Sequence, residues 1–133
     1  MPHCILDKAY RVNQSGGVAA HRVVVQGTNP GECKCPAAAD AGEILGVTTH
    51  AQGEDGRPVA VRKAGIALVE ASGAIAVGAS VSIADTDGKV KAISLGAGQS
   101  TWCLGTAETA ASADGDLIEV FLGIHRHTVP YQP

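Results

Sequence analysis

The chain has 133 residues and a formal net charge of -3; 45% of its residues are hydrophobic, but only 3% are aromatic. This length suits one domain, and the acidic balance with so few rings argues against a nucleic-acid partner. No apolar run approaches the roughly 18 residues of a membrane-spanning helix, and the N-terminus lacks the pattern of a signal peptide. We therefore expect a compact protein made in a cytosol-like compartment, without a membrane partner.

The N-terminal residues 1–15 carry an unusual number of apolar side chains for a terminus, at Ile5, Leu6, Tyr10 and Val12. Two interpretations stand side by side. The segment is an extended arm that adds to an edge of another protein, or it is the first core strand of this domain.

Residues 16–124 are expected to form one β-domain, because short β-branched runs alternate with turns rich in Gly, Asn and Asp. The expected strands lie at residues 9–12, 22–26, 44–49, 59–63, 66–70, 80–84, 89–93, 102–104 and 117–122. Asp87-Gly88 is the strongest hairpin signal, because Asp-Gly tolerates the positive φ of a tight turn. Helix signals are weak, a turn or two at 37–43 and 108–113. We predict an all-β fold with little helix, a small barrel or sandwich of short antiparallel strands.

Residues 27–40 are expected to be a loop inserted into this domain, since they contain two Pro and two Gly residues. Cys33 and Cys35 form a C-x-C pair there. Zinc sites generally use two such pairs, and the chain has no second one. Ordinary reduced thiols are therefore expected, with a metal or a disulfide as the alternative.

A sequence pattern recurs at a shift of 59 residues. Residues 45–61 read LGVTTHAQGEDGRPVAV, and residues 104–120 read LGTAETAASADGDLIEV. Both begin with Leu-Gly, hold Asp-Gly at the same place and end in alternating apolar residues, as expected for a strand, a turn and a returning strand. The pattern favours an internal structural repeat, with chance similarity in a chain rich in Gly and Ala as the alternative.

No group of residues amounts to a catalytic or cofactor-binding motif. His125 and His127 would share one side of a strand, but no Cys or carboxylate lies nearby to complete a metal site; a solvated tail over residues 125–133 is expected instead. Residues 85–88 (DTDG) begin like a calcium loop but lack its later acidic ligands. The remaining histidines are interpreted as surface residues: His3, His21 and His50. We expect no enzyme activity, no cofactor and no bound metal.

Residues 39–122 resemble the small capsid decoration, or cement, proteins of tailed double-stranded DNA bacteriophages. The resemblance lies in the order of glycines and strands: ADAGEILGVTT, GRPVAVRKAGIALV, GAIAVGASVSI, DGKV, LGTAETA and ADGDLIEVFL. It implies a β-clip or β-tulip kind of fold. It also implies a structural virion protein, made in the host cytoplasm, that binds the outer surface of the expanded head and stabilises it as a homotrimer near local three-fold axes.

The resemblance further implies the phage major capsid protein as partner. Because an N-terminal arm often makes that contact in the family, Ile5, Leu6, Tyr10 and Val12 are the expected contact residues. The 27–40 loop and the tail from Arg126 depart from a minimal family member, and either could hold the specific contact. Two other functions stay open: a tail or baseplate module of the virion, and a small β-barrel that binds a ligand or acts as an enzyme.

Overall fold

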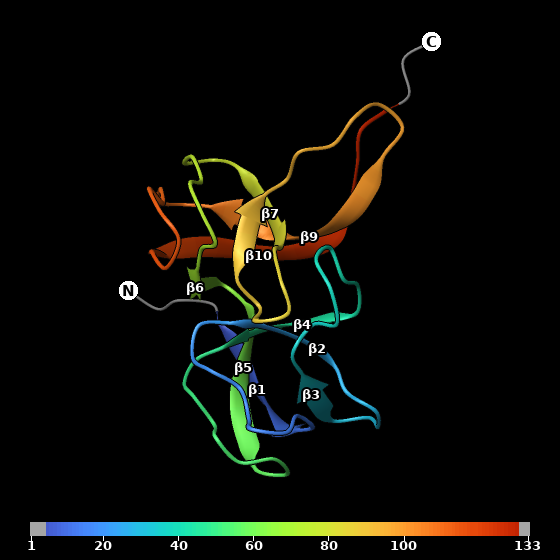
Figure 1. Cartoon of the computed structure of the whole chain (residues 1–133), viewed down its shortest axis with the longest axis vertical. Coiled ribbons are helices and arrows are strands. Elements are labelled where there is room, and N and C mark those ends of the chain that lie inside the picture. Colours follow the sequence, from blue (N-terminus) through green and yellow to red (C-terminus); the bar gives the residue numbers. More distant parts are fainter. Residues whose placement is uncertain (1–4, 131–133) are drawn as a thin grey trace.

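The computed structural model describes residues 5–130, which form strands and turns without a helix (Figure 1). The strands are β1 (Leu6–Val12), β2 (Val23–Gln26), β3 (Glu32–Lys34), β4 (Ile44–Thr48), β5 (Pro58–Ala64), β6 (Ile66–Glu70), β7 (Ser80–Ile83), β8 (Val90–Ala92), β9 (Ser100–Ala107) and β10 (Leu117–Thr128). They build a closed barrel in the order β1-β3-β2-β4-β5 and a five-stranded sheet in the order β6-β10-β9-β7-β8. The predicted small all-β fold is confirmed. Over the described residues there is no helix that could span a membrane.

Every strand expected from the sequence is present, although β1 and β9 are longer than expected. The larger differences lie at two places. β3 falls inside the segment that the sequence predicts to be a loop, and it pairs with both β1 and β2. A strand of three residues among Gly and Pro has no periodicity to reveal it. β10 continues to Thr128, so residues 125–128 pair with β9 where the sequence predicts a solvated tail. The segments with weak helix signals, 37–43 and 108–113, are mostly bends and turns.

The two sheets follow one strand plan, so the chain consists of a first half (residues 6–64) and a second half (residues 66–128). Four cross-strand residue pairs of the first half recur in the second half at a shift of 59 residues. In this order, first half then second half, they are Val47–Arg62 and Thr106–Phe121, Thr48–Val61 and Ala107–Val120, Ala9–Ala60 and Leu68–Glu119, and Tyr10–Val59 and Val69–Ile118. The parallel pair Val12–Cys33, which closes the first barrel, has a counterpart in the parallel bridge Ala71–Val90, although Val90 lies two residues before the position that the shift of 59 gives for Cys33. Each half therefore has the same order of five strands, which closes fully into a barrel in the first half.

A glycine occupies the same place in each half, on β4 and on β9. A Cβ atom on Gly46 would collide with the carbonyl oxygen of Arg62, and one on Gly105 would collide with that of Phe121. Gly46 also has a φ of 152°, which side-chain-bearing residues rarely adopt. The Leu-Gly of the repeated sequence is thus explained by a close approach of two strands that leaves no room for a side chain.

The hydrophobic core has two parts that share β2. Because side chains alternate along a strand, Val24 lies among the core residues of the first barrel, whereas Val23 and Val25 lie in the core cluster of the second half. Val47 of β4 joins that second cluster. Burial of these three valines across the junction contributes about 5 kcal/mol by area, and the halves are therefore parts of one body.

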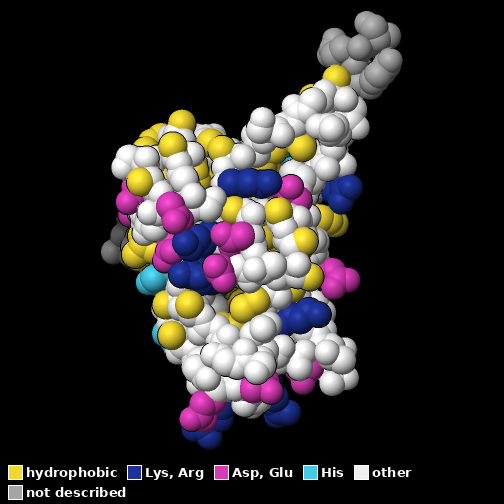
Figure 2. All heavy atoms as spheres, viewed as in Figure 1, with side chains coloured by type: hydrophobic (Ala, Val, Ile, Leu, Met, Phe, Trp, Pro, Cys, Tyr) yellow, Lys and Arg dark blue, Asp and Glu magenta, His cyan; other side chains and the backbone are white. Residues whose placement is uncertain are grey.

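Charged side chains line the junction between the halves, and Figure 2 shows basic and acidic groups side by side at this level. Glu70 accepts from Arg22 of the first half at 3.2 Å and from Lys89 of the second half at 3.3 Å. Lys89 also reaches Asp114 at 3.0 Å. Backbone hydrogen bonds from Val23 N–H to Gly88 O (2.8 Å) and from Glu70 N–H to His21 O (3.0 Å) cross the same junction.

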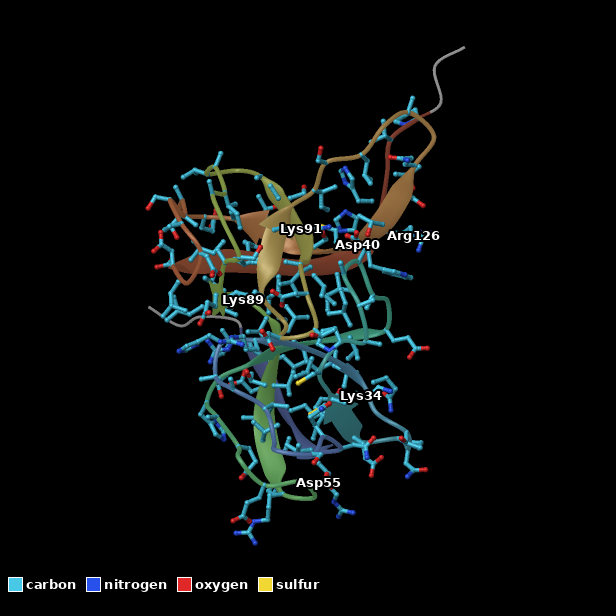
Figure 3. All side chains as sticks on the ribbon, in the orientation of Figure 1. Lys34, Asp40, Asp55, Lys89, Lys91 and Arg126 are labelled. Carbon is cyan, nitrogen blue, oxygen red and sulfur yellow. The ribbon has the colours of Figure 1, made fainter. Side chains whose placement is uncertain are left out.

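Asp40 ties the long β3–β4 connection to the second half (Figure 3). Its carboxylate accepts hydrogen bonds from Ser82 Oγ (3.0 Å), Thr101 Oγ1 (3.2 Å) and Lys91 Nζ (3.1 Å). Burial by itself would raise the pKa of Asp40, but the hydrogen bonds from Lys91, Ser82 and Thr101 outweigh it and hold that pKa below its ordinary value. The charged form of Asp40 therefore stabilises the folded state.

Gly105→Ala is expected to lower the free energy of unfolding by about 1–3 kcal/mol, the usual result of forcing extra atoms into a packed site. Gly46→Ala is expected to lower it at least as much, because its φ of 152° adds strain. Gly123→Ala in β10 is the matched control, since nothing lies within 4 Å of its Cβ position. Urea unfolding followed by circular dichroism measures all three; equal stability of the Gly105→Ala and Gly123→Ala proteins would contradict the close approach.

Asp40→Asn keeps the side-chain shape and the tolerance of positive φ that this position requires, but removes the charge. A carboxyl group whose pKa is lowered by folding adds stability above its unfolded pKa, and that stability is lost as the pH falls through the folded pKa. We expect the variant to melt at a lower temperature than the wild type at about pH 7, with a gap that shrinks below about pH 4. A gap that stays constant in thermal melts down to about pH 2 would rule out a role for the charge.

Candidate docking face

The equivalent β-ribbons, β1 with β5 and β6 with β10, present outer faces of different chemistry. The outward cross-strand pairs are Asp7–Arg62, Ala9–Ala60 and Arg11–Pro58 on the first ribbon, and Ile66–Phe121, Leu68–Glu119 and Glu70–Leu117 on the second. The first set is small or charged, and four members of the second set are large and apolar. Because both ribbons share one backbone plan, the fold itself requires neither composition, and the difference points to what each face meets.

The apolar residues of the second ribbon are exposed to solvent. Phe121 is 56% exposed, and Ile66, Leu68 and Leu117 are between 41% and 48% exposed. Ile5 and Leu6, at the start of the first ribbon, are also about half exposed. We call these six residues the apolar face. Among the described residues, Val77 is the large hydrophobic side chain that is exposed elsewhere. An exposed apolar group of this kind marks an interaction site.

A groove of about 810 Å³ lies on this face. Ile5, Ile66, Leu68 and Phe121 line it, and Arg62 and Glu119 are its charged margins. Arg62 and Ala64 of the first half also line the groove, so its position depends on how the halves pack together.

The two charged residues of the groove, Arg62 and Glu119, differ in whether they have an ion-pair partner. Arg62 binds both carboxylate oxygens of Asp7, at 2.9 and 3.2 Å, and donates to the backbone oxygen of Ile66 at 3.2 Å. The hydrogen bond from Arg62 holds the pKa of Asp7 below its ordinary value. Glu119 has no cationic partner within residues 5–130. The groove is therefore apolar with one carboxylate available for a basic partner.

The four contact residues expected from the sequence fall into two pairs. Ile5 and Leu6 belong to the apolar face. Tyr10 and Val12 are 5% and 1% exposed and belong to the core of the first barrel, because they alternate inward along β1. They are not available as surface contacts in this fold. Residues 2–4 of the expected arm lie outside the described residues.

Sequence reasoning missed Ile66, Leu68 and Phe121. Each lies in an expected strand, where an apolar residue is ordinarily assigned to the core. The signal that could have found them is the repeat itself. At the shift of 59 these positions align with Asp7, Ala9 and Arg62, and a polar or small residue in one copy indicates an outward position in the other.

The other side chains singled out by the sequence do not converge. Cys33 is buried in the first barrel, and burial raises the pKa of its thiol to about 11. Cys33 and Cys35 are free thiols. His125 and His127 do lie together on β10, with ring centroids 6.2 Å apart, but within residues 5–130 no three His, Cys, Asp or Glu side chains are grouped to hold a metal. The hairpin between β7 and β8 that Asp87-Gly88 predicts is present, with its turn one residue earlier, at residues 86–87.

Comparison with known proteins places the chain in a family. No curated protein is significantly similar to it in sequence. Among solved structures it is similar to the head fiber gp8.5 N base of bacteriophage phi29, with a TM-score of 0.63 and 18% identity over 90% of this chain and 94% of that chain. At this identity the likeness concerns the fold alone. The family model of phage cement proteins matches residues 7–122, and the chain therefore belongs to the phage cement protein family.

Proposed function

We propose that the chain is a structural protein of the phage virion that binds the outer surface of the expanded head and stabilises the shell. Membership in the cement protein family and the fold shared with a phage head fiber base support a virion role. The observation that carries the contact is the apolar face, whose four β6 and β10 residues stand where the first ribbon has small or charged side chains.

Shell stabilisation of this kind needs no chemistry. A protein that binds only the assembled, expanded shell stabilises that state by mass action. Six half-exposed apolar side chains contribute about 5 kcal/mol of gross burial per copy, which many copies multiply. The proposed partner is the major capsid protein, and the proposed assembly is a homotrimer near local three-fold axes, where linked copies raise the effective concentration of each contact.

The geometry gives less support to a small-molecule site. A ligand pocket combines an apolar lining with a few convergent polar groups. His21, His50 and Asp55, the polar residues that a ligand-binding barrel could use, do not line the groove, and His50 and Asp55 are exposed. The groove combines an apolar floor with one ion pair and one free carboxylate, which suits a protein surface better than a substrate.

Phe121→Asp is expected to weaken binding of the chain to purified expanded heads by about a hundredfold, because it places a charge in the centre of the apolar face. The fold should tolerate this change, since Arg62 holds the equivalent position in the first half. Val77→Asp is the control, because Val77 is 65% exposed but lies away from the groove. Co-sedimentation with expanded and unexpanded heads measures binding; equal binding of Phe121→Asp and wild type to expanded heads would contradict the assigned face.

A further inference from the structure

We infer that β6 accepts an extended segment of the shell protein as an added strand, along the free edge beside the apolar face. This inference rests on the proposed function, and it names the mode of contact and the chemistry of the partner segment.

The first argument is the direction of the backbone groups of β6. β6 lies at the edge of its sheet and pairs with β10. Leu122 N–H donates to Gly65 O and Ala71 N–H donates to Asp116 O, both at 2.8 Å. Since such pairs alternate along an antiparallel ladder, odd-numbered residues of β6 bond to β10, and the N–H and C=O of Leu68 point away from it. On this outward side Arg62 donates to the C=O of Ile66, the N–H of Glu70 donates to His21 O, and Ala71 bridges Val90 of β8. Within the described residues the free part of the edge is therefore centred on Leu68, whose N–H and C=O both lack a partner.

The second argument is that residues 66–69 of β6 lack, in their own side chains, the protection usual for an exposed edge. Natural edges carry charges, proline or bulges that prevent pairing with another chain. β8, at the other edge of this sheet, is flanked by Lys89, and Lys91 lies within it. The free side of β1 carries the Asp7–Arg62 ion pair and a bulge after Leu6. Residues 66–69 of β6 contain neither charge nor proline.

The third argument concerns the occupant. An added strand places alternate side chains over the groove, so the matching segment has apolar residues at every second position. A Lys or Arg near its middle would pair with Glu119, which has no cation among the described residues. The segment therefore comes from a chain with an extended, apolar and basic stretch.

A second copy of this chain fits the edge less well. The other edges within the described residues are the lysine-flanked β8 and the charged side of β1. Pairing β6 with its own copy across a two-fold axis would offer Glu119 no cation, because residues 66–69 of the second copy carry no charge.

The test separates the backbone edge from the side chains. Leu68→Pro removes an N–H that β10 does not use, and proline is accepted at sheet edges, whereas Leu68→Ala removes only the side chain. Ala9→Pro is the matched control, since Ala9 pairs with Ala60 as Leu68 pairs with Glu119 and also directs its N–H to a free side. Circular dichroism and thermal melts establish that each variant is folded. If Leu68→Pro does not fold, hydrogen exchange of wild-type residues 66–69 with and without heads decides the question.

We expect Leu68→Pro to bind expanded heads about tenfold more weakly than Leu68→Ala, Ala9→Pro to bind like the wild type, and residues 66–69 to exchange more slowly on bound heads. Equal binding of Leu68→Pro and Leu68→Ala, or unchanged exchange, would overturn strand addition while leaving head binding intact. If the wild type is an oligomer by native mass measurement and Leu68→Pro lowers that mass, the edge binds a second copy of the chain, and the proposal of a shell segment is overturned. If the wild type fails to bind heads at all, the proposed function fails, and this inference falls with it.

Discussion

The close approach at Gly46 and Gly105 is the constraint on which the fold depends. At each site a strand runs so near the carbonyl oxygen of its partner, Arg62 or Phe121, that no Cβ atom fits between them. This contact fixes the register of β4 on β5 and of β9 on β10, and those registers are the same at a shift of 59 residues. Once the registers are set, the inward positions of both ribbons are set as well, and small aliphatic side chains suffice to fill the two cores.

Because the two halves share a backbone arrangement but differ in side chains, their equivalent positions can be compared directly. Inward positions are similar in the two halves, for example Val61 and Val120. The outward positions differ. Asp7 and Arg62 form an ion pair in the first half, and the equivalent positions in the second half hold the exposed Ile66 and Phe121. Packing cannot account for that divergence. We interpret the first half as the support and the second ribbon as the docking surface, held in place by the valines of β2 and by the contacts of Glu70 and Asp40.

The sequence predicted the strands well because β-branched runs and Asp-Gly turns are local signals. The Asp-Gly pairs at residues 55–56 and 114–115 do form turns in which each glycine has a positive φ. The direction in which strand residues point was harder, since an exposed Phe121 and a buried Val120 look alike in an apolar strand. Tyr10 and Val12 could therefore not be assigned to a contact arm or to a core strand from the sequence alone, and the apolar face was missed. β3 was not predicted, because its position is set by pairing with β1 and β2 rather than by its own residues.

A reconstruction of expanded phage heads bearing this chain tests the central claim most directly, because it shows which side of the molecule meets the shell. The outer face of β6 and β10 should lie against the major capsid protein, with a strand of that protein alongside residues 66–69 and a basic side chain near Glu119. A reconstruction in which Ile66, Leu68 and Phe121 face solvent, or face another copy of this chain, would contradict the assignment of the second ribbon as the docking surface.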